Sequence, residues 1–492
     1  MTSVLVIGAG IGGIAVAGRL AHRGYDVTVL EKNAVPGGRL NKLLQDGHRF
    51  DVGPSLFLMP QTYAATYTAL GERMEDHLDL KRVDPTYHLH FEDGSKIQLS
   101  ANINWMQEQL EAIEPGSFGG LLRYLSEGHR HFTLSLDRFV GQNFYTLFDE
   151  FNPSNLPMLF QLKALTMHYD NIGNYFTDPK LKAAFTFQDM YLGLSPYEAP
   201  ATYSLLQYTE LADGVWFPIG GMYRVVESLT SIAQGHGARF VYESPVKQIV
   251  VEGNRATGVV LEDGSVRSAD IVIANADLPY VYDRLLPDRG LAQRMMNKQF
   301  TCSAIMFYWG VDKTYPQLAH HSVFLSGDYK ASFDRIFHDQ TLPERPSFYI
   351  HVPNRTDPAA APPGCENLMV LVPVGCLYEE LDQDFEALRA RAKETVFKRL
   401  EKLGIADLEA HIKHEVSYTP HDWREMFNLA RGAAFGLGHN FTQVGYLRPH
   451  NRHGRYKNLY FCGASTHPGT GVPIVLIGAG LVEERIAKEA PL

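Results

Sequence analysis

The segment Ser3-Val-Leu-Val-Ile-Gly-Ala-Gly-Ile-Gly-Gly13 decides the fold of this chain. It begins with an apolar, β-branched run, which is typical of a buried parallel strand. The glycines that follow, Gly8, Gly10 and Gly13, form the pattern G-x-G-x-x-G, and the apolar positions between Ile11 and Arg23 predict a helix. The segment therefore predicts a strand, a tight glycine turn and a helix, which together form the first unit of a Rossmann-like α/β domain.

Each glycine of this turn has a physical role in binding a dinucleotide. Gly8 permits the turn, Gly10 lets the backbone approach a pyrophosphate, and Gly13 lets the helix pack closely on the sheet. The helix N-terminus then faces the pyrophosphate with free N–H groups and the positive end of its dipole. A second strand, Val27 to Leu30, ends at Glu31, where a carboxylate can bind ribose hydroxyls.

A second glycine-rich segment indicates FAD rather than NAD as the dinucleotide. Pro36-Gly-Gly-Arg39 follows Glu31 closely, and an arginine after two glycines can hold a fixed charge against a phosphate. Asp51 to Ser55 adds another glycine turn. This pattern resembles the flavin amine oxidase and phytoene desaturase superfamily, whereas simple NAD-dependent dehydrogenases lack the Gly-Gly-Arg extension.

The C-terminal segment carries a second motif. Leu459 to Cys462 predicts a buried strand, Gly463 to Gly471 a rigid loop, and Val472 to Ile486 a helix. The N-terminus of that helix can stabilise negative charge on a flavin. The loop, T-H-P-G-T-G, resembles the signature of bacterial-type phytoene desaturases almost position by position, and Phe217 to Gly221 also fits. The chain is thus similar, over essentially its full length, to the carotenoid and retinoid oxidoreductases, including the dehydrosqualene desaturases.

The motifs and the resemblance together give the expected site residues. His467 is the nearest titratable candidate for acid–base catalysis, and the alternative is that it only orders its loop. Arg39 is expected to contact the cofactor rather than to act as an acid. Val246 is included because the resemblance implies that its backbone lies near the adenine end. The expected cofactor-binding residues are Gly8, Ala9, Gly10, Ile11, Gly12, Gly13, Glu31, Lys32, Gly38, Arg39, Gly53, Pro54, Ser55, Val246, Gly463, Gly471, Val472 and Pro473.

The chain of 492 residues has room for two or three domains. We expect a discontinuous FAD-binding domain of residues 1–75, 215–290 and 440–492. An interleaved α+β substrate domain is expected at residues 76–104 and 291–439, with a helical, aromatic-rich, membrane-facing region at residues 105–214. In the substrate domain the expected elements are strands at residues 88–91, 96–99, 303–310, 347–351 and 367–374, and helices at 382–403 and 422–430.

The aromatic residues of the helical region fit three roles. They can form an ordinary core, line an apolar cavity, or belong to a surface that dips into a bilayer. Amphipathic patterning alone does not distinguish these roles, because it does not say whether a face meets core, lipid or ligand.

Composition excludes several classes of partner. The net charge of −10, without a basic stripe, argues against nucleic acid. The four cysteines are widely spaced, so neither a disulfide framework nor a zinc site is expected. His129 with His131, and His320 with His321, are interpreted as surface residues because no matching carboxylate pattern accompanies them, and no metal is expected.

Membrane contact is expected to be peripheral. The longest apolar run, Gly471 to Val482, is too short to span a bilayer and contains Pro473. The first residues lack a basic region of the kind that begins a signal peptide, so a cytoplasmic protein attached to a lipid surface is expected.

The resemblance implies the chemistry of a carotenoid desaturase. In such enzymes FAD accepts a hydride from a hydrophobic polyene such as phytoene, a neighbouring carbon loses a proton, and quinone or oxygen reoxidises the cofactor. The alternatives are a C30 dehydrosqualene desaturase, a carotene isomerase, saturase or oxidase, an amine oxidase with flavin attached through Cys462, and a non-catalytic flavoprotein or membrane escort. The sequence indicates no oligomeric state.

Overall fold

The predicted first strand lies at the centre of a five-stranded parallel sheet. The structure is a computed structural model that describes residues 1–150, 153 and 155–492. Its first sheet has the order β19-β13-β1-β2-β9, and every neighbouring pair is parallel. The strands are β1 (Ser3–Ile7), β2 (Asp26–Leu30), β9 (Arg239–Val241), β13 (Ile271–Ala274) and β19 (Leu459–Phe461). The carboxyl ends of strands from the start, middle and end of the chain therefore meet at one edge.

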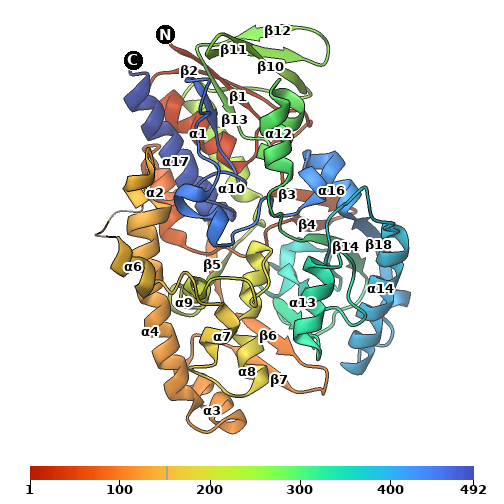
Figure 1. Cartoon of the computed structure of the whole chain (residues 1–492). Helices are drawn as coiled ribbons and strands as arrows, with labels where there is room; N and C mark the ends of the chain where they lie inside the picture. Colours follow the sequence, from red (N-terminus) through yellow and green to blue (C-terminus); the bar gives the residue numbers. More distant parts are fainter. Residues whose placement is uncertain (151–152, 154) are drawn as a thin grey trace.

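Three helices cover the first sheet around one apolar core. Helix α1 (Ile11–His22) packs against α10 (Arg224–Gly235) and α17 (Val472–Glu489). Helices α1 and α17 differ from their expected ranges by three residues or fewer, within the usual uncertainty of helix ends. The two chain ends lie near one another at this end of the molecule (Figure 1).

A second, seven-stranded sheet has the order β18-β14-β17-β16-β15-β6-β7. The expected strands are present as β6 (Tyr87–His90), β7 (Lys96–Leu99), β14 (Ser303–Val311), β16 (Phe348–His351) and β17 (Glu366–Val374). Two strands were not expected, β15 (His321–Phe324) and β18 (Ile412–Tyr418), and neither was the parallel pairing of β6 with β15. Helix α14 (Phe385–Lys402) covers one face and contributes Val396 and Leu400 to the core of this sheet.

Two helices of this half begin at capping residues that the periodicity did not reveal. Helix α14 begins at Phe385 rather than Asp382, because the Asp384 side chain accepts a hydrogen bond from the Ala387 N–H. Helix α16 (Pro420–Phe427) begins before the expected Asp422, which instead closes a capping box with Thr419.

Smaller sheets complete the fold. They are β10 (Val246–Glu252) with β11 (Arg255–Leu261) and β12 (Val266–Ser268), β3 (Asn41–Gln45) with β4 (His48–Val52), and β5 (Leu80–Val83) with β8 (Val215–Pro218). The β3–β4 hairpin was missed, although its turn residues Asp46 and Gly47 both have positive φ and form a strong Asp-Gly hairpin signal. This hairpin leads the chain from β4 directly into the site.

The region of residues 105–214 is helical, as expected, but most of its helices are short. Helices α3 (Ile103–Ile113) and α4 (Ser117–Ser135) are the long ones, and α4 runs along one side of the molecule (Figure 1). The short ones are α5 (Leu147–Glu150), α6 (Leu156–Gln161), α7 (His168–Ile172), α8 (Pro179–Ala184) and α9 (Leu205–Tyr208). Elsewhere lie α2 (Pro60–Thr68), α11 (Leu278–Tyr280), α12 (Arg289–Met296), α13 (Tyr329–Phe337) and α15 (Leu408–His411). The domain boundaries remain a prediction.

Within the described residues, every helix is too short or too polar to cross a bilayer.

Candidate active site

The G-x-G-x-x-G turn forms a cradle that has no room for side chains. Gly8 has a φ of +94°. A Cβ atom at Gly13 would lie 2.1 Å from the Gly8 carbonyl oxygen, and one at Gly12 would lie 2.7 Å from side-chain atoms of Asn275 and Val475. The residue before α1, Gly10, offers no side-chain cap, so the first N–H groups of the helix are available to an anion. This cradle fits a dinucleotide pyrophosphate.

Glu31 is held at the end of β2 by two backbone groups. Its Oε2 accepts a hydrogen bond from the Ala9 N–H at 2.7 Å, and its Oε1 accepts one from the Asn33 N–H at 2.9 Å. The carboxylate lies beside the cradle, at the position that suits a ribose. Lys32 is turned toward α16, where its Nζ donates to the Glu425 carbonyl oxygen at 2.7 Å and to Asn428 Oδ1 at 3.0 Å.

Half-buried Arg39 and buried Asp277 lie next to this cradle. Arg39 Nη1 donates to the Ala434 carbonyl oxygen at 2.9 Å, and Asp277 accepts from Ser465 Oγ at 2.6 Å and from the Ala430 N–H at 3.0 Å. Burial lowers the pKa of Arg39 and raises that of Asp277, and the attraction between the two opposes both shifts. Arg39 therefore brings a charge to a dry site.

Asn275 and Asp277 also lie at this site, at the carboxyl edge of the first sheet, and the sequence analysis did not predict them as site residues. Asn275 Nδ2 donates to the Gly8 carbonyl oxygen at 3.2 Å and so holds the first glycine of the turn. Both residues directly follow β13, which pairs with β1. A signal existed, because ligands of parallel sheets bind at the carboxyl ends of the strands.

One cavity of about 790 Å³ joins the cradle to the helical region and to the second sheet. His467 and all the expected cofactor residues line it, except Ala9 and Gly13, which are buried. The structure thus brings the expected residues together, while their individual roles remain predictions. The opposite wall is apolar and aromatic, with Phe132, Phe139, Phe187 and Tyr191 from the helical region and Ala304, Met306, Tyr349 and Leu371 from the second sheet.

His467 ties the C-terminal loop to the helical region. Its Nε2 lies 2.8 Å from the Gln142 carbonyl oxygen, and its ring meets that of Phe144 edge-on at 5.1 Å. Burial lowers the pKa of His467 to about 4, so the ring is neutral at pH 7. These contacts fit the alternative that His467 orders the loop, and its role as an acid or base remains a prediction.

Cys462 does not have the surroundings of a reactive thiol. It is buried behind the cavity wall, where its Sγ would lie 2.9 Å from a Cβ placed on Gly12. Burial raises the pKa of this thiol to about 12, so it stays protonated at neutral pH. The structure therefore offers no activated thiol at this position for covalent attachment of a flavin.

The interpretation of three histidines as surface residues was wrong. His129 is exposed, but His131, His320 and His321 are buried. The unexpected strand β15 pairs His321 with His351, and one nitrogen from each of His320, His321 and His351 lies within 4.8 Å of the others.

These three histidines are neutral and partly hydrogen-bonded to each other. Burial lowers the pKa of each, and the charge of Arg355 lowers that of His320 further. The Nε2 atoms of His320 and His351 lie 3.1 Å apart, so one donates to the other. We interpret the group as a chain of neutral imidazoles, and the absence of a metal remains a prediction.

Comparisons with known proteins agree with this site. A family model described as flavin containing amine oxidoreductase matches residues 11–477. The chain is 47% identical over 485 residues to a zeta-carotene-forming phytoene desaturase of Myxococcus xanthus, covering 98% of this chain and 93% of that protein. It is 33% identical over 496 residues to a 4,4'-diapophytoene desaturase (4,4'-diaponeurosporene-forming) of Staphylococcus haemolyticus, covering 99% of each. A solved double mutant of putrescine oxidase matches with a TM-score of 0.64 at 17% identity, covering 99% of this chain and 98% of that one.

The chain therefore belongs to the flavin containing amine oxidoreductase family. It is an FAD-dependent oxidoreductase, and the family and the Rossmann-like fold that its two motifs indicated are confirmed. The glycine cradle, the fixed Glu31 carboxylate and the half-buried Arg39 are the groups that fit FAD.

Proposed function

We propose that this protein introduces C=C bonds into a carotenoid polyene, phytoene or its shorter C30 counterpart. The observation that carries the proposal is that a single cavity runs from the glycine cradle to an aromatic, apolar wall. The relatives named above are phytoene and 4,4'-diapophytoene desaturases, which act on molecules of this class. When bound, FAD supplies the capacity to take up two electrons and a hydrogen from a C–H bond.

The cavity wall suits a substrate without polar groups. A polyene offers no hydrogen-bonding group along its middle, so its position depends on shape and on apolar contact. Phe132, Phe187 and Tyr191 supply aromatic surface against which a conjugated chain packs. The same side chains exclude water from the reacting carbon atoms.

The substrate enters from a lipid surface in this proposal. The described residues between positions 145 and 167 expose several large apolar side chains, and their relative exposures reach 77% at Phe148 and Phe160 and 70% at Leu165. Leu159 and Leu162, from the same segment, line the cavity. An exposed apolar patch beside a cavity mouth is typical of membrane contact. We therefore propose a cytoplasmic protein attached peripherally to a membrane, with quinone or oxygen as the electron acceptor.

The test is anaerobic incubation of the FAD-loaded protein with phytoene in liposomes, followed by flavin absorbance and pigment extraction. Bleaching of the flavin with new, red-shifted polyene bands is expected, and the band positions count the double bonds. Bleaching with dehydrosqualene alone would identify the C30 polyene as the substrate. Bleaching by a small amine such as putrescine instead would support an amine oxidase, and no bleaching by any of them would support a non-catalytic flavoprotein.

A further inference from the structure

A chain of two hydroxyl groups and an imidazole leads from the cavity into the second sheet. Ser55 and Tyr349 both line the cavity. Ser55 Oγ lies 2.8 Å from Tyr349 Oη, which lies 2.7 Å from Nδ1 of the fully buried His321. The chain begins where the β3–β4 hairpin meets the second sheet, and it ends inside that sheet.

The strand register places these groups together. Tyr349 and His351 are two residues apart on β16, so they share one face of the sheet. His321 on β15 pairs with His351 in the antiparallel ladder, and Tyr349 is its diagonal neighbour on the same face. The Tyr349–His321 contact therefore follows from backbone pairing and not from a flexible surface side chain.

The three groups can form one continuous chain of hydrogen bonds from Ser55 to His321. If Ser55 donates to Tyr349 Oη, Tyr349 donates its own proton to His321, and Nδ1 carries the lone pair. His321 Nε2 then bears the hydrogen, and this atom has no hydrogen-bond partner among the described residues. In this state a neutral base lies one hydroxyl group away from the cavity.

Desaturation creates a proton that must leave an apolar cavity. One carbon atom gives up its hydrogen with both electrons to the cofactor, and the neighbouring C–H bond must break with loss of a proton as the C=C bond forms. We infer that Tyr349 Oη accepts this proton while its own proton passes to His321 Nδ1. This inference rests on the proposed function, and it adds Tyr349 as a catalytic residue and His321 as the group that holds the proton.

The proton count closes over a full turnover. His321 becomes an imidazolium, and Tyr349 is neutral again after the first half of the reaction. A quinone or oxygen gains two electrons and two protons in all when it reoxidises the cofactor, so one of the two protons returns from His321 through Tyr349. The relay is then neutral and ready for the next substrate.

The surroundings of His321 keep it unprotonated at rest. Burial, followed by the neighbouring His320 and His351, lowers its pKa well below the usual value. Tyr87 also packs beside His321, with their ring centres 5.6 Å apart. Its hydroxyl group donates a hydrogen bond to Glu210 at 2.9 Å, and burial raises the pKa of Glu210 to about 8. A weak base suffices, because a C–H bond next to an electron-deficient carbon atom is strongly acidic.

The test compares Tyr349→Phe and His321→Asn in anaerobic single-turnover bleaching with phytoene liposomes. Asparagine can still accept the Tyr349 hydrogen bond but cannot hold a proton. The bleaching rate should fall about 100-fold or more in both variants, with unchanged half-saturation for phytoene, and the double variant should be no slower than either single one. The controls are His320→Asn, in the same cluster but not bonded to Tyr349, and Tyr308→Phe, a buried tyrosine outside the cavity wall. Both controls should bleach at the wild-type rate.

A second readout does not depend on activity. In protein labelled with ¹⁵N-histidine, the His321 Nδ1 signal, identified by its loss in His321→Asn, should be that of an unprotonated nitrogen and should shift in Tyr349→Phe. Three results would each overturn the relay while the proposed function stands. They are a protonated Nδ1, wild-type bleaching rates in both Tyr349→Phe and His321→Asn, and a loss of bleaching rate in His320→Asn equal to that in His321→Asn. A wild-type protein that no polyene bleaches would overturn the proposed function and the relay with it.

Discussion

The first sheet and the described part of the helical region of residues 105–214 each have a buried core, but the two cores differ in their interactions. The core around α1 consists of apolar side chains from β1, β2, α10 and α17. The helical region has apolar core residues too, and it also buries many polar and charged groups, including Glu127, His131, His168, Asp189, Gln207 and Glu210. The first arrangement follows from local apolar patterns, whereas the second depends on polar partners far apart in sequence.

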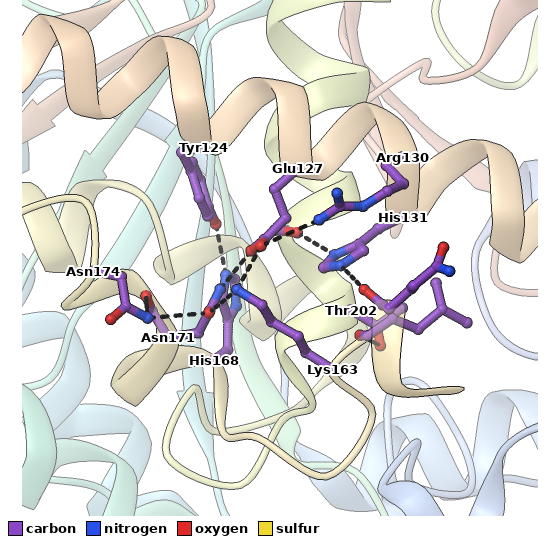
Figure 2. Close-up of polar contacts among 12 residues, drawn as sticks. Tyr124, Glu127, Arg130, His131, Lys163, His168, Asn171, Asn174 and Thr202 are labelled. Carbon is purple, nitrogen blue, oxygen red and sulfur yellow. Dashed lines mark hydrogen bonds and ion pairs between the residues drawn. The ribbon is translucent and has the colours of Figure 1, made fainter. Parts of the chain in front are cut away.

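The polar network of the helical region joins α4 to the short helices beside it (Figure 2). Lys163 Nζ lies 2.5 Å from Glu127 Oε2, and Asn171 Nδ2 donates to Glu127 Oε1 at 2.7 Å. His168 lies between Tyr124 Oη, at 2.6 Å, and Asp189 Oδ2, at 2.8 Å. Several of these helices have only four to six residues, too few to be stable alone, so the network contributes to their position.

The largest effect is expected in the first sheet, from Gly13→Ala. The new Cβ atom would lie 2.1 Å from a backbone oxygen that has no room to move, so α1 must shift away from β1. The purified protein should lose its FAD almost completely, and it should unfold at a lower temperature. Flavin absorbance per chain and a thermal melt measure the two effects.

Gly235→Ala is the matched control for this change. Gly235 ends α10 under the same sheet, and a Cβ atom there would meet nothing within 4 Å. This variant should keep its FAD and be equally stable or more stable by about 0.4–1 kcal/mol. Full FAD content in Gly13→Ala would contradict the cradle described above.

A smaller effect is expected in the helical region, from Lys163→Met. This change removes the 2.5 Å ion pair of the buried Glu127 carboxylate and leaves it the longer pair with the more exposed Arg130, at 3.7 Å, which should lower the free energy of unfolding by about 2–3 kcal/mol. Urea unfolding measures the loss, while FAD content should be unchanged because Lys163 does not line the cavity.

Two further variants test whether the burial of the Glu127 charge causes this loss of stability. Adding Glu127→Gln to Lys163→Met should restore most of the stability, because no buried charge is then left unpaired. Lys398→Met breaks an exposed pair with Glu394 on α14 and should change the free energy of unfolding little. Equal losses in Lys163→Met and Lys398→Met would show that the buried network contributes little.

The sequence-based predictions were accurate where local patterns determine the structure and failed where distant segments come together. The strands of the first sheet, the cradle and the C-terminal loop were predicted within a few residues, because apolar runs and glycines encode them locally. Strand β15 was missed, since its pairing with β6 joins segments far apart in the chain and leaves no local pattern. The burial of His320 and His321 was missed for that reason, and so were the partners of Tyr349.

The predictions of site residues also succeeded only where a local motif marks the residue. Glu31 and Arg39 were predicted because each stands at a fixed spacing from a glycine motif. Asn275 and Asp277 were missed because only the pairing of β13 with β1 brings them to the cradle. The aromatic residues of the helical region turned out to serve more than one role: Tyr124 is in a core, Phe187 lines the cavity and Phe160 is exposed.

A tenfold effect on membrane binding is expected from the exposed part of the helical region. Phe160→Ser and Leu165→Ser each remove apolar area that should enter the lipid, so each should weaken sedimentation with liposomes about tenfold. Stability and FAD content should not change. Val266→Ser on β12 removes an equally exposed apolar side chain elsewhere, at 62% exposure, and should bind liposomes as the wild type does. Equal binding by all these variants would place the membrane contact on another surface.

The smallest effect concerns the pH dependence of the helical region. His131 Nε2 donates to the Gln161 carbonyl oxygen at 2.9 Å, and Nδ1 lies 2.7 Å from Ser204 Oγ. Burial lowers the pKa of His131 to about 4. The unfolded chain, with a histidine pKa near 6.5, takes up the proton first, so this contribution to stability is complete above about pH 6.5 and is lost as the pH falls toward 4. In His131→Gln the drop in unfolding free energy from pH 6 to pH 5 should therefore be smaller by about 1 kcal/mol, measured by urea titration. His129→Gln, two residues away on the exposed face of α4, should leave the slope unchanged. If the drop in unfolding free energy is unchanged in His131→Gln, His131 is already charged in the folded protein. The polar network of the helical region then carries one more positive charge than expected from the burial of His131.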